Sequence, residues 1–209
     1  MKKVLFILLL LSGYCYSQKT DSEKSMFYVD MATSKLTITG NYSKEELEIL
    51  DKKNIADFFD LINKALEYDS KNTYALYWKS KIELQNLKYE EAYQNLSKYL
   101  KYQEYDFNND LLSGAAQTMI LLKKKLKIKT YKNELDLLNK ISNARLKVNP
   151  ENGDSIALVL SYYLFSENKK EASRFLESSK IEPKNLDYFR KLIKDFKLNT
   201  FVKNLNDMM

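Results

Sequence analysis

The sequence of 209 residues has no histidine, one cysteine, two prolines and four glycines. Without histidine, the chain has neither a Ser-His-Asp nor a Cys-His nucleophile pair, and it offers no imidazole to a metal ion. Four scattered glycines form no phosphate-binding loop, and the motifs G-x-G-x-x-G and G-K-[ST] are missing. We therefore expect no catalytic residue, no cofactor and no metal site.

Paired carboxylates are one hydrolytic chemistry that these absences leave open. The pairs in the sequence are Glu45 with Glu46, Asp57 with Asp60, and Glu90 with Glu91. On helices, such spacings are typical of solvated faces, and no pair stands beside a sequence signal for a pocket. A non-enzymatic protein is the expectation, and a hydrolase ranks third among the functional hypotheses.

The first 17 residues have the pattern of a secretory signal peptide. Lys2 and Lys3 form a positive start, Val4–Leu11 is an apolar run of eight residues, and small and polar residues follow. The run is too short for a transmembrane helix, which needs about 20 residues. Cleavage after Ser17 would lower the net charge from +6 to +4 and remove the single cysteine. We expect an exported protein that is periplasmic, on the cell surface or secreted.

Cys15 allows an alternative interpretation of the same segment. Leu11-Ser12-Gly13 before a cysteine resembles the box that precedes the lipidated cysteine of bacterial lipoproteins, which would anchor the chain at Cys15. Tyr14 departs from that box, because the residue just before a lipidated cysteine is normally small. Plain cleavage is the leading interpretation, and mass spectrometry of the mature amino terminus distinguishes the two.

From residue 43 onward the sequence is patterned for α-helices. Apolar side chains recur every three or four residues, and prolines occur only at Pro150 and Pro183. A capping box beginning at Ser43 opens one helix, and Asn54 followed by Asp57 predicts the start of the next. Turn-like clusters punctuate the rest at residues 69–72, 108–110, 149–153 and 182–185. The fold class is therefore all-α.

The punctuation recurs at a nearly constant distance. Small Ser80 is followed after 34 residues by Gly114, and Pro150 is followed after 33 residues by Pro183. A period near 34 that is filled by two helices predicts an array of helix-turn-helix repeats.

With this period, the segment Ala75–Ala92 resembles a tetratricopeptide repeat. In that family a small residue in the first helix lets the second helix approach closely, and Ser80 and Gly114 match it. Tyr89-Glu90-Glu91-Ala92 resembles the opening of a second helix, and Asn168–Ala172 resembles a later copy. The motifs are degenerate, and the unit that ends near Asn152 is about 12 residues longer than the family's repeat.

The resemblance implies helix pairs that stack into a short right-handed superhelix over residues 43–184. Such an array needs a cap at its end, and residues 185–209 are expected to supply a capping helix and tail, with the helix at Asn185–Leu198. Residues 18–42 match neither helix nor repeat. Lys35–Thr39 alternates like a strand, so we expect a partly ordered amino-terminal arm there.

The resemblance also implies where a partner binds, because first helices of successive tetratricopeptide units line a concave face that usually receives a peptide. Tyrosine and tryptophan often dominate binding energy, although Trp78 is also a candidate for core packing. The face lacks the Lys and Asn pattern by which chaperone-binding members hold a terminal carboxylate. Carried over to this chain, the face consists of Tyr74, Tyr77, Trp78, Lys81, Gln85, Leu111, Thr118 and Phe165.

A basic run follows in the longest unit. It could form a patch for anionic lipid, glycan or nucleic acid, or a solvated helix end that the helix dipole favours. The solvated helix end is the favoured interpretation, and export argues against nucleic acid. The run consists of Lys123, Lys124, Lys125, Lys127, Lys129 and Lys132.

These patterns predict an exported, non-enzymatic scaffold of the tetratricopeptide kind that binds a protein or peptide on its concave face. The leading alternative is a peripheral membrane or cell-envelope component that uses the basic run. The identity of the partner, the biological process and the oligomeric state stay open.

Overall fold

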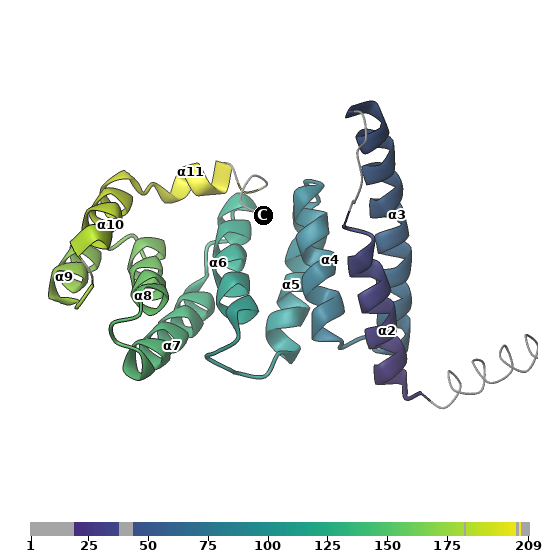
Figure 1. Ribbon diagram of the computed structural model, residues 1–209, viewed down its shortest axis with the longest axis horizontal. Helices are drawn as coiled ribbons and strands as arrows, with labels where there is room; N and C mark the ends of the chain where they lie inside the picture. The colour runs from purple at the N-terminus through teal and green to yellow at the C-terminus, as the bar shows by residue number, and fades with distance from the viewer. Residues whose placement is uncertain (1–18, 38–43, 182, 204, 206–209) are drawn as a thin grey trace, which may run out of the picture. The chain divides into compact units, whose positions relative to one another are not determined.

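The computed structural model describes residues 19–37, 44–181, 183–203 and 205. Over these ranges the chain is all-α, with helices joined by turns and no strand, as the sequence predicts (Figure 1). The predictions of a signal peptide and of lipidation at Cys15 concern residues 1–17 and lie outside the described residues. The helices are α2 Asp21–Ser34, α3 Lys44–Tyr68, α4 Thr73–Gln85, α5 Tyr89–Tyr102, α6 Asp110–Lys125, α7 Lys132–Val148, α8 Gly153–Phe165, α9 Lys169–Ser178, α10 Pro183–Asp195 and α11 Leu198–Lys203.

The chain divides into two compact units, Met1–Ile82 and Glu83–Met209. The division falls inside α4, at none of the boundaries that the sequence predicts. In the described ranges, every helix is too short or too polar to cross a membrane.

Helix α2 occupies part of the segment that the sequence predicts as a partly ordered arm. A capping box starts it: Thr20 Oγ1 accepts from the Glu23 backbone N–H at 3.2 Å, and the Glu23 carboxylate accepts from the Thr20 N–H at 2.7 Å. These bonds, the backbone one first, lower the pKa of Glu23. Val29 and Ala32 face inward, and α2 packs along α3. Residues 21–34 are therefore a helix, which corrects the expectation of an irregular arm.

The first unit has an apolar core with one buried polar network. Asn72 joins three segments: its Nδ2 donates to Ser25 Oγ at 2.8 Å, and its Oδ1 accepts from the Ala75 N–H at 3.0 Å. Ser25 in turn donates to the Ala65 carbonyl at 2.7 Å. Every buried polar atom in this network gains a partner, which favours one packing of α2 on α3. The buried core residues are Val29, Ala32, Phe58, Ile62, Ala65, Ala75 and Ile82.

The predicted helix start at Asn54 is wrong, because α3 runs without interruption from Lys44 to Tyr68. No glycine or proline occurs within these 25 residues, and Phe58, Ile62 and Ala65 continue one apolar stripe into the core. The Asn54 side chain therefore lies within a continuous helix.

In the second unit, helices that follow each other in the chain pack on each other. The contacts run in order from α5 to α10, each helix against its successor. Helix α11 departs from this order: it leaves the end of α10 and returns to contact α6 (Figure 1). Packing between chain neighbours is the pattern of a helical repeat array, in which each helix pair buries its apolar face against the next.

The ends of α4, α6 and α8 share one turn geometry. After α4, the Lys88 N–H donates to the Glu83 carbonyl at 2.9 Å and the Leu87 N–H to the Leu84 carbonyl at 3.0 Å. This pair of bonds defines a Schellman motif, whose left-handed residue is usually glycine. Here that residue is Leu87, Lys127 or Glu167, with φ of 61°, 58° and 59°.

The starts of the same three helices also match. The side-chain oxygens of Asn72, Asn109 and Asn152 accept backbone N–H bonds from the first turns of α4, α6 and α8. These caps stand 37 and 43 residues apart, and the left-handed turn residues stand 40 apart. The described units are therefore longer than the predicted period near 34, because the helices and loops differ in length from one unit to the next.

Two details of the predicted repeat have opposite outcomes. The second helices α5 and α9 begin at Tyr89 and Lys169, as predicted, and Ala92 and Ala172 at their starts are fully buried. Gly114, in contrast, is not needed for close approach, since a Cβ atom added to it would meet no atom within 4 Å.

The carboxyl-terminal helix differs from its predicted bounds of Asn185–Leu198. Helix α10 ends at Asp195, the chain breaks helical structure at Phe196 and Lys197, and α11 begins at Leu198. Phe196, Leu198 and Leu205 are all buried in the second unit.

Candidate interaction surfaces

Four predicted partner residues share one face of α4 in the first unit: Tyr74, Tyr77, Trp78 and Lys81. Their spacing of three and four residues places them together on the helix. Tyr74 is 52% exposed, whereas the other three are half-buried. Burial raises the pKa of the Tyr77 hydroxyl. We call these four residues the α4 aromatic face.

Contacts within the first unit hold this face in a defined shape. Trp78 packs against the core and meets Tyr77 edge-on, with 6.1 Å between ring centroids. The Lys81 ammonium lies 5.2 Å from the centroid of the Trp78 ring, within the range of a cation–π contact. Trp78 therefore serves both as core packing and as the floor of the exposed face.

The other predicted partner residues lie in the second unit and differ in accessibility. Gln85 is exposed, and Leu111 and Thr118 on α6 are half-buried. Phe165 is 5% exposed, because its ring packs against Phe196 at 6.0 Å between centroids. The placement of Phe165 on a binding face is therefore wrong, and it belongs to the core between α8 and the end of α10.

Carboxylates and a ring engage half of the basic run. The Lys123 ammonium lies 2.7 Å from Glu134 Oε1, and both side chains are largely buried. Lys124 pairs with Glu167; burial opposes the charge of Lys124, but this hydrogen bond and the nearby Tyr131 raise its pKa overall. Lys125 lies 4.8 Å from the centroid of the Tyr89 ring.

The other half of the run is exposed, at Lys127, Lys129 and Lys132. Lys127 is the left-handed residue of the turn after α6, and Lys132 begins α7. The run therefore combines a helix end tied to its own protein with three solvated lysines. This arrangement agrees with the favoured interpretation of a solvated helix end.

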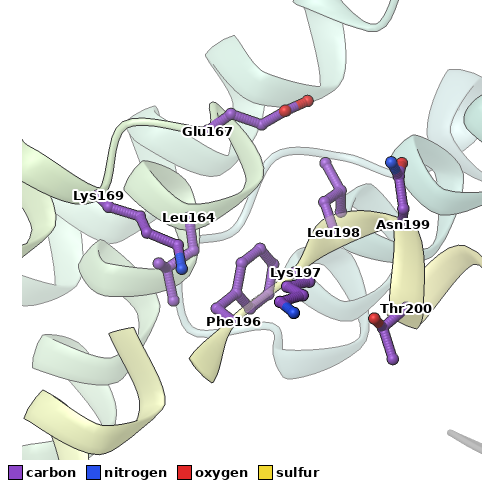
Figure 2. A pocket seen from close by; sticks show the side chains of 8 residues that line it. All are labelled: Leu164, Glu167, Lys169, Phe196, Lys197, Leu198, Asn199 and Thr200. Atoms are coloured by element: carbon purple, nitrogen blue, oxygen red, sulfur yellow. The ribbon is translucent and has the colours of Figure 1, made fainter. Parts of the chain in front are cut away.

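A cavity of about 350 Å³ lies where α8, α9 and the α10–α11 connection meet. Figure 2 shows Leu164 and Lys169 on one side, the α11 side chains on the other, and Phe196 and Lys197 between them. Leu164, Phe196 and Leu198 form its apolar part. Its lining residues are Leu164, Glu167, Lys169, Phe196, Lys197, Leu198, Asn199 and Thr200.

A second, polar cavity of about 220 Å³ lies between the start of α6, the end of α7 and the start of α8. Arg145 organises it: Nη1 lies 2.6 Å from Asp110 Oδ1, and Nε donates to the Phe107 carbonyl. Its Nη2 is buried and finds no hydrogen-bond acceptor among the described residues.

Acid–base chemistry has little basis in the described residues. Glu83 is buried, but Asn95 Nδ2 donates to both of its carboxylate oxygens, at 3.0 and 2.8 Å. Glu134 is engaged by Lys123. Within the described ranges, no group of three or more His, Cys, Asp or Glu side chains is placed to hold a metal ion.

The sequence identifies the α4 aromatic face but misses both cavities. Each cavity joins residues from segments far apart in the chain, such as Leu164 with Thr200 and Phe107 with Ser155. Lys169 and Asn152 carry local signals for helix starts, and nothing in those signals indicates a cavity. No family model, curated protein or solved structure matches this chain.

Proposed function

We propose that the chain is an exported, non-enzymatic scaffold of the tetratricopeptide kind that binds a polypeptide partner through the α4 aromatic face. The observation that carries this proposal is the face itself, with exposed Tyr74 beside half-buried Tyr77 and Trp78. Aromatic side chains that are already held in place lose little conformational entropy on binding and are frequent hot spots.

The repeat-like part of the proposal rests on two features of the described helices. Helices of the second unit pack on their chain neighbours, and α4, α6 and α8 share an asparagine cap and a left-handed closing turn. Helix-turn-helix repeats are expected to show both features. The longer spacing makes these units a variant of the 34-residue tetratricopeptide pattern.

The alternative of membrane attachment through the basic run has weaker support. Lys123 and Lys124 are bound to carboxylates of the same unit, so their charges are largely neutralised. Three exposed lysines at positions 127, 129 and 132 remain for an anionic surface.

Capture of partners from an envelope extract tests the proposal. We expect Tyr74→Ala to reduce recovery of the partner by about tenfold, the effect of losing a hot-spot side chain. Because Tyr74 is exposed, the free energy of unfolding should change by less than about 0.5 kcal/mol.

The matched control is Tyr188→Ala, since Tyr188 is 65% exposed and lies on α10 in the other unit. We expect the control to recover the same proteins as the unaltered chain. Equal recovery by Tyr74→Ala and Tyr188→Ala would show that the α4 aromatic face is not the binding surface.

A further inference from the structure

Helix α11 and the residue just beyond it form a short amphipathic segment. Leu198 and Leu205 are 5% and 1% exposed, and Phe201 and Val202 are half-buried. These positions follow the spacing i, i+3, i+4, i+7 of one helix face. The exposed side chains between them are Asn199, Thr200 and Lys203.

Apolar packing alone holds this segment in place. None of the Leu198–Lys203 side chains forms an ion pair or a hydrogen bond within the described part of the chain. The Phe201 ring stacks on Phe196 at 4.9 Å between centroids, and Leu198 packs beside it at the edge of the cavity. Such contacts are tolerant of sequence, so another apolar segment of similar shape can replace them.

The segment is also poorly fixed by its own backbone. A helix of six residues is too short to be stable alone, so α11 depends on its packing against α6. The break at Phe196 and Lys197 separates it from α10, and the Phe201 N–H bond to the Lys197 carbonyl is long, at 3.4 Å. Local opening of α11 therefore needs no change in α10.

The surroundings of α11 carry a positive charge that the protein does not balance there. The cavity beside α11 has Lys169 and Lys197 at its rim, and neither forms an ion pair within the described residues. Lys169 Nζ donates to the backbone carbonyl of Lys194 at 2.8 Å. The one carboxylate of the cavity, Glu167, is already paired with Lys124.

We propose that α11 is an intramolecular ligand, and that the partner of the second unit is an amphipathic helix with an acidic polar face that displaces it. Its apolar residues take the places of Leu198, Phe201, Val202 and Leu205, and its carboxylates meet Lys169 and Lys197. This inference rests on the proposed function, because α6, which α11 contacts, also carries the predicted partner residues Leu111 and Thr118.

A tethered segment competes strongly with any partner. Since α11 is joined to α10 by two residues, its effective concentration at α6 is on the order of millimolar. A partner must exceed that competition, so the free chain binds more weakly than a chain whose α11 is detached.

Fluorescence anisotropy with three full-length chains tests this mechanism. The probe is a labelled synthetic peptide of residues 195–205 in which Asn199, Thr200 and Lys203 are replaced by glutamate. The detaching variant is Leu198→Asp with Leu205→Asp, and the matched control is Asn199→Asp with Thr200→Asp, which adds the same charge at exposed positions. We expect the detaching variant to bind the probe at least about tenfold more tightly than the other two chains.

The role of the rim lysines has its own prediction in this assay. The unsubstituted peptide of residues 195–205 should bind the detaching variant more weakly than the acidic probe at low salt. The difference should shrink in 0.5 M salt, because exposed charges are screened. Equal affinity of the two peptides at low salt would refute the acidic polar face.

Equal probe binding by all three chains, with the detaching variant still helical by circular dichroism, would overturn the displacement mechanism. If that variant unfolds, hydrogen exchange on the unaltered chain decides. We expect the acidic probe to speed exchange in α11 while slowing it in α6, and no response in either helix would also overturn the mechanism. Failure of capture through Tyr74 would affect neither result, because these measurements concern the second unit alone.

Discussion

The side chain of Lys123 illustrates how a residue that looks like part of a surface patch can be structural. Its ammonium lies 2.7 Å from Glu134 Oε1 between α6 and α7, and both side chains are largely buried. Glu134 Oε2 has no partner in the described part of the chain, so the carboxylate depends on Lys123 for its charge balance.

We therefore expect Lys123→Ala to lower the free energy of unfolding by about 2 to 3 kcal/mol, because a buried carboxylate loses its counter-ion. Urea unfolding measures this change. Exposed Lys132 is the matched control, and Lys132→Ala should change stability by less than about 0.5 kcal/mol. Similar small losses for both lysines would mean that Glu134 is solvated in solution.

Gly114 gives the opposite case, a residue whose change should stabilise the protein. It lies inside α6, and an added Cβ atom meets nothing within 4 Å. We expect Gly114→Ala to raise the free energy of unfolding by about 0.5 to 1 kcal/mol, since alanine restricts the unfolded chain and favours helix. Gly153→Ala, at the first position of α8, should have a smaller effect. A lower urea midpoint for Gly114→Ala would show that this position needs glycine for packing.

Single residues of the candidate site were predictable where exposure follows from one helix face. Tyr74 and Trp78 on α4 occupy the positions that the sequence suggests. Phe165 could not be placed in this way, because α8 is apolar on most of its circumference and periodicity does not distinguish its faces. Its burial depends on Phe196, a residue from a distant part of the chain.

At the scale of the helices, an ion pair links α9 to α10. Arg190 donates two hydrogen bonds of 2.9 Å to the two carboxylate oxygens of Glu177. These bonds lower the pKa of Glu177, so the pair stabilises the folded state above the ordinary pKa of a glutamate, about 4.3. That contribution is lost as the pH falls through the lowered pKa.

We expect Glu177→Gln to lower the Tm at pH 7 and to have no effect at pH 2.5, where the native carboxyl is protonated. Thermal unfolding of both proteins across this range measures the difference. Glu91→Gln is the control, since Glu91 is exposed in the first turn of α5. A Tm difference for Glu177→Gln that persists at pH 2.5 would assign the effect to packing instead.

Helix α2 shows why some elements escaped sequence reasoning. Its inward side chains include Ser25 and Ala32, so it lacks the broad apolar stripe that identifies α5 or α9. Its stability comes from tertiary contacts, namely packing on α3 and the hydrogen bonds of Ser25 with Asn72 and the Ala65 carbonyl. The helix starts at Tyr89 and Lys169 were predictable because their signals are local.

For the whole molecule, the two compact units should differ in how they respond to core mutations. Phe58 lies in the core of the first unit and Leu138 in that of the second, and both are fully buried. We expect each change to alanine to cost about 3 to 4 kcal/mol. Hydrogen exchange should show the loss of protection mainly in α2 and α3 for Phe58→Ala, and mainly in α6–α9 for Leu138→Ala.

The two substitutions are matched controls for each other. If either one removes protection evenly from both units, the chain unfolds as a single cooperative body. The all-α class and most helix positions from residue 73 onward could be predicted at this scale. The return of α11 to α6 could not, because that contact joins segments separated by more than 70 residues and has no local signal.

The closing turns of α4, α6 and α8 also bear on how such a chain can change in length. Because the three turns share one backbone geometry, each forms an equivalent joint, and successive joints stand 40 residues apart. A gene segment that begins after one joint and ends at the next, such as residues 88–127, could be duplicated or removed while the same pair of closing hydrogen bonds is rebuilt. Modular growth of the chain would thus require compatible neighbouring helix faces, but no new turn.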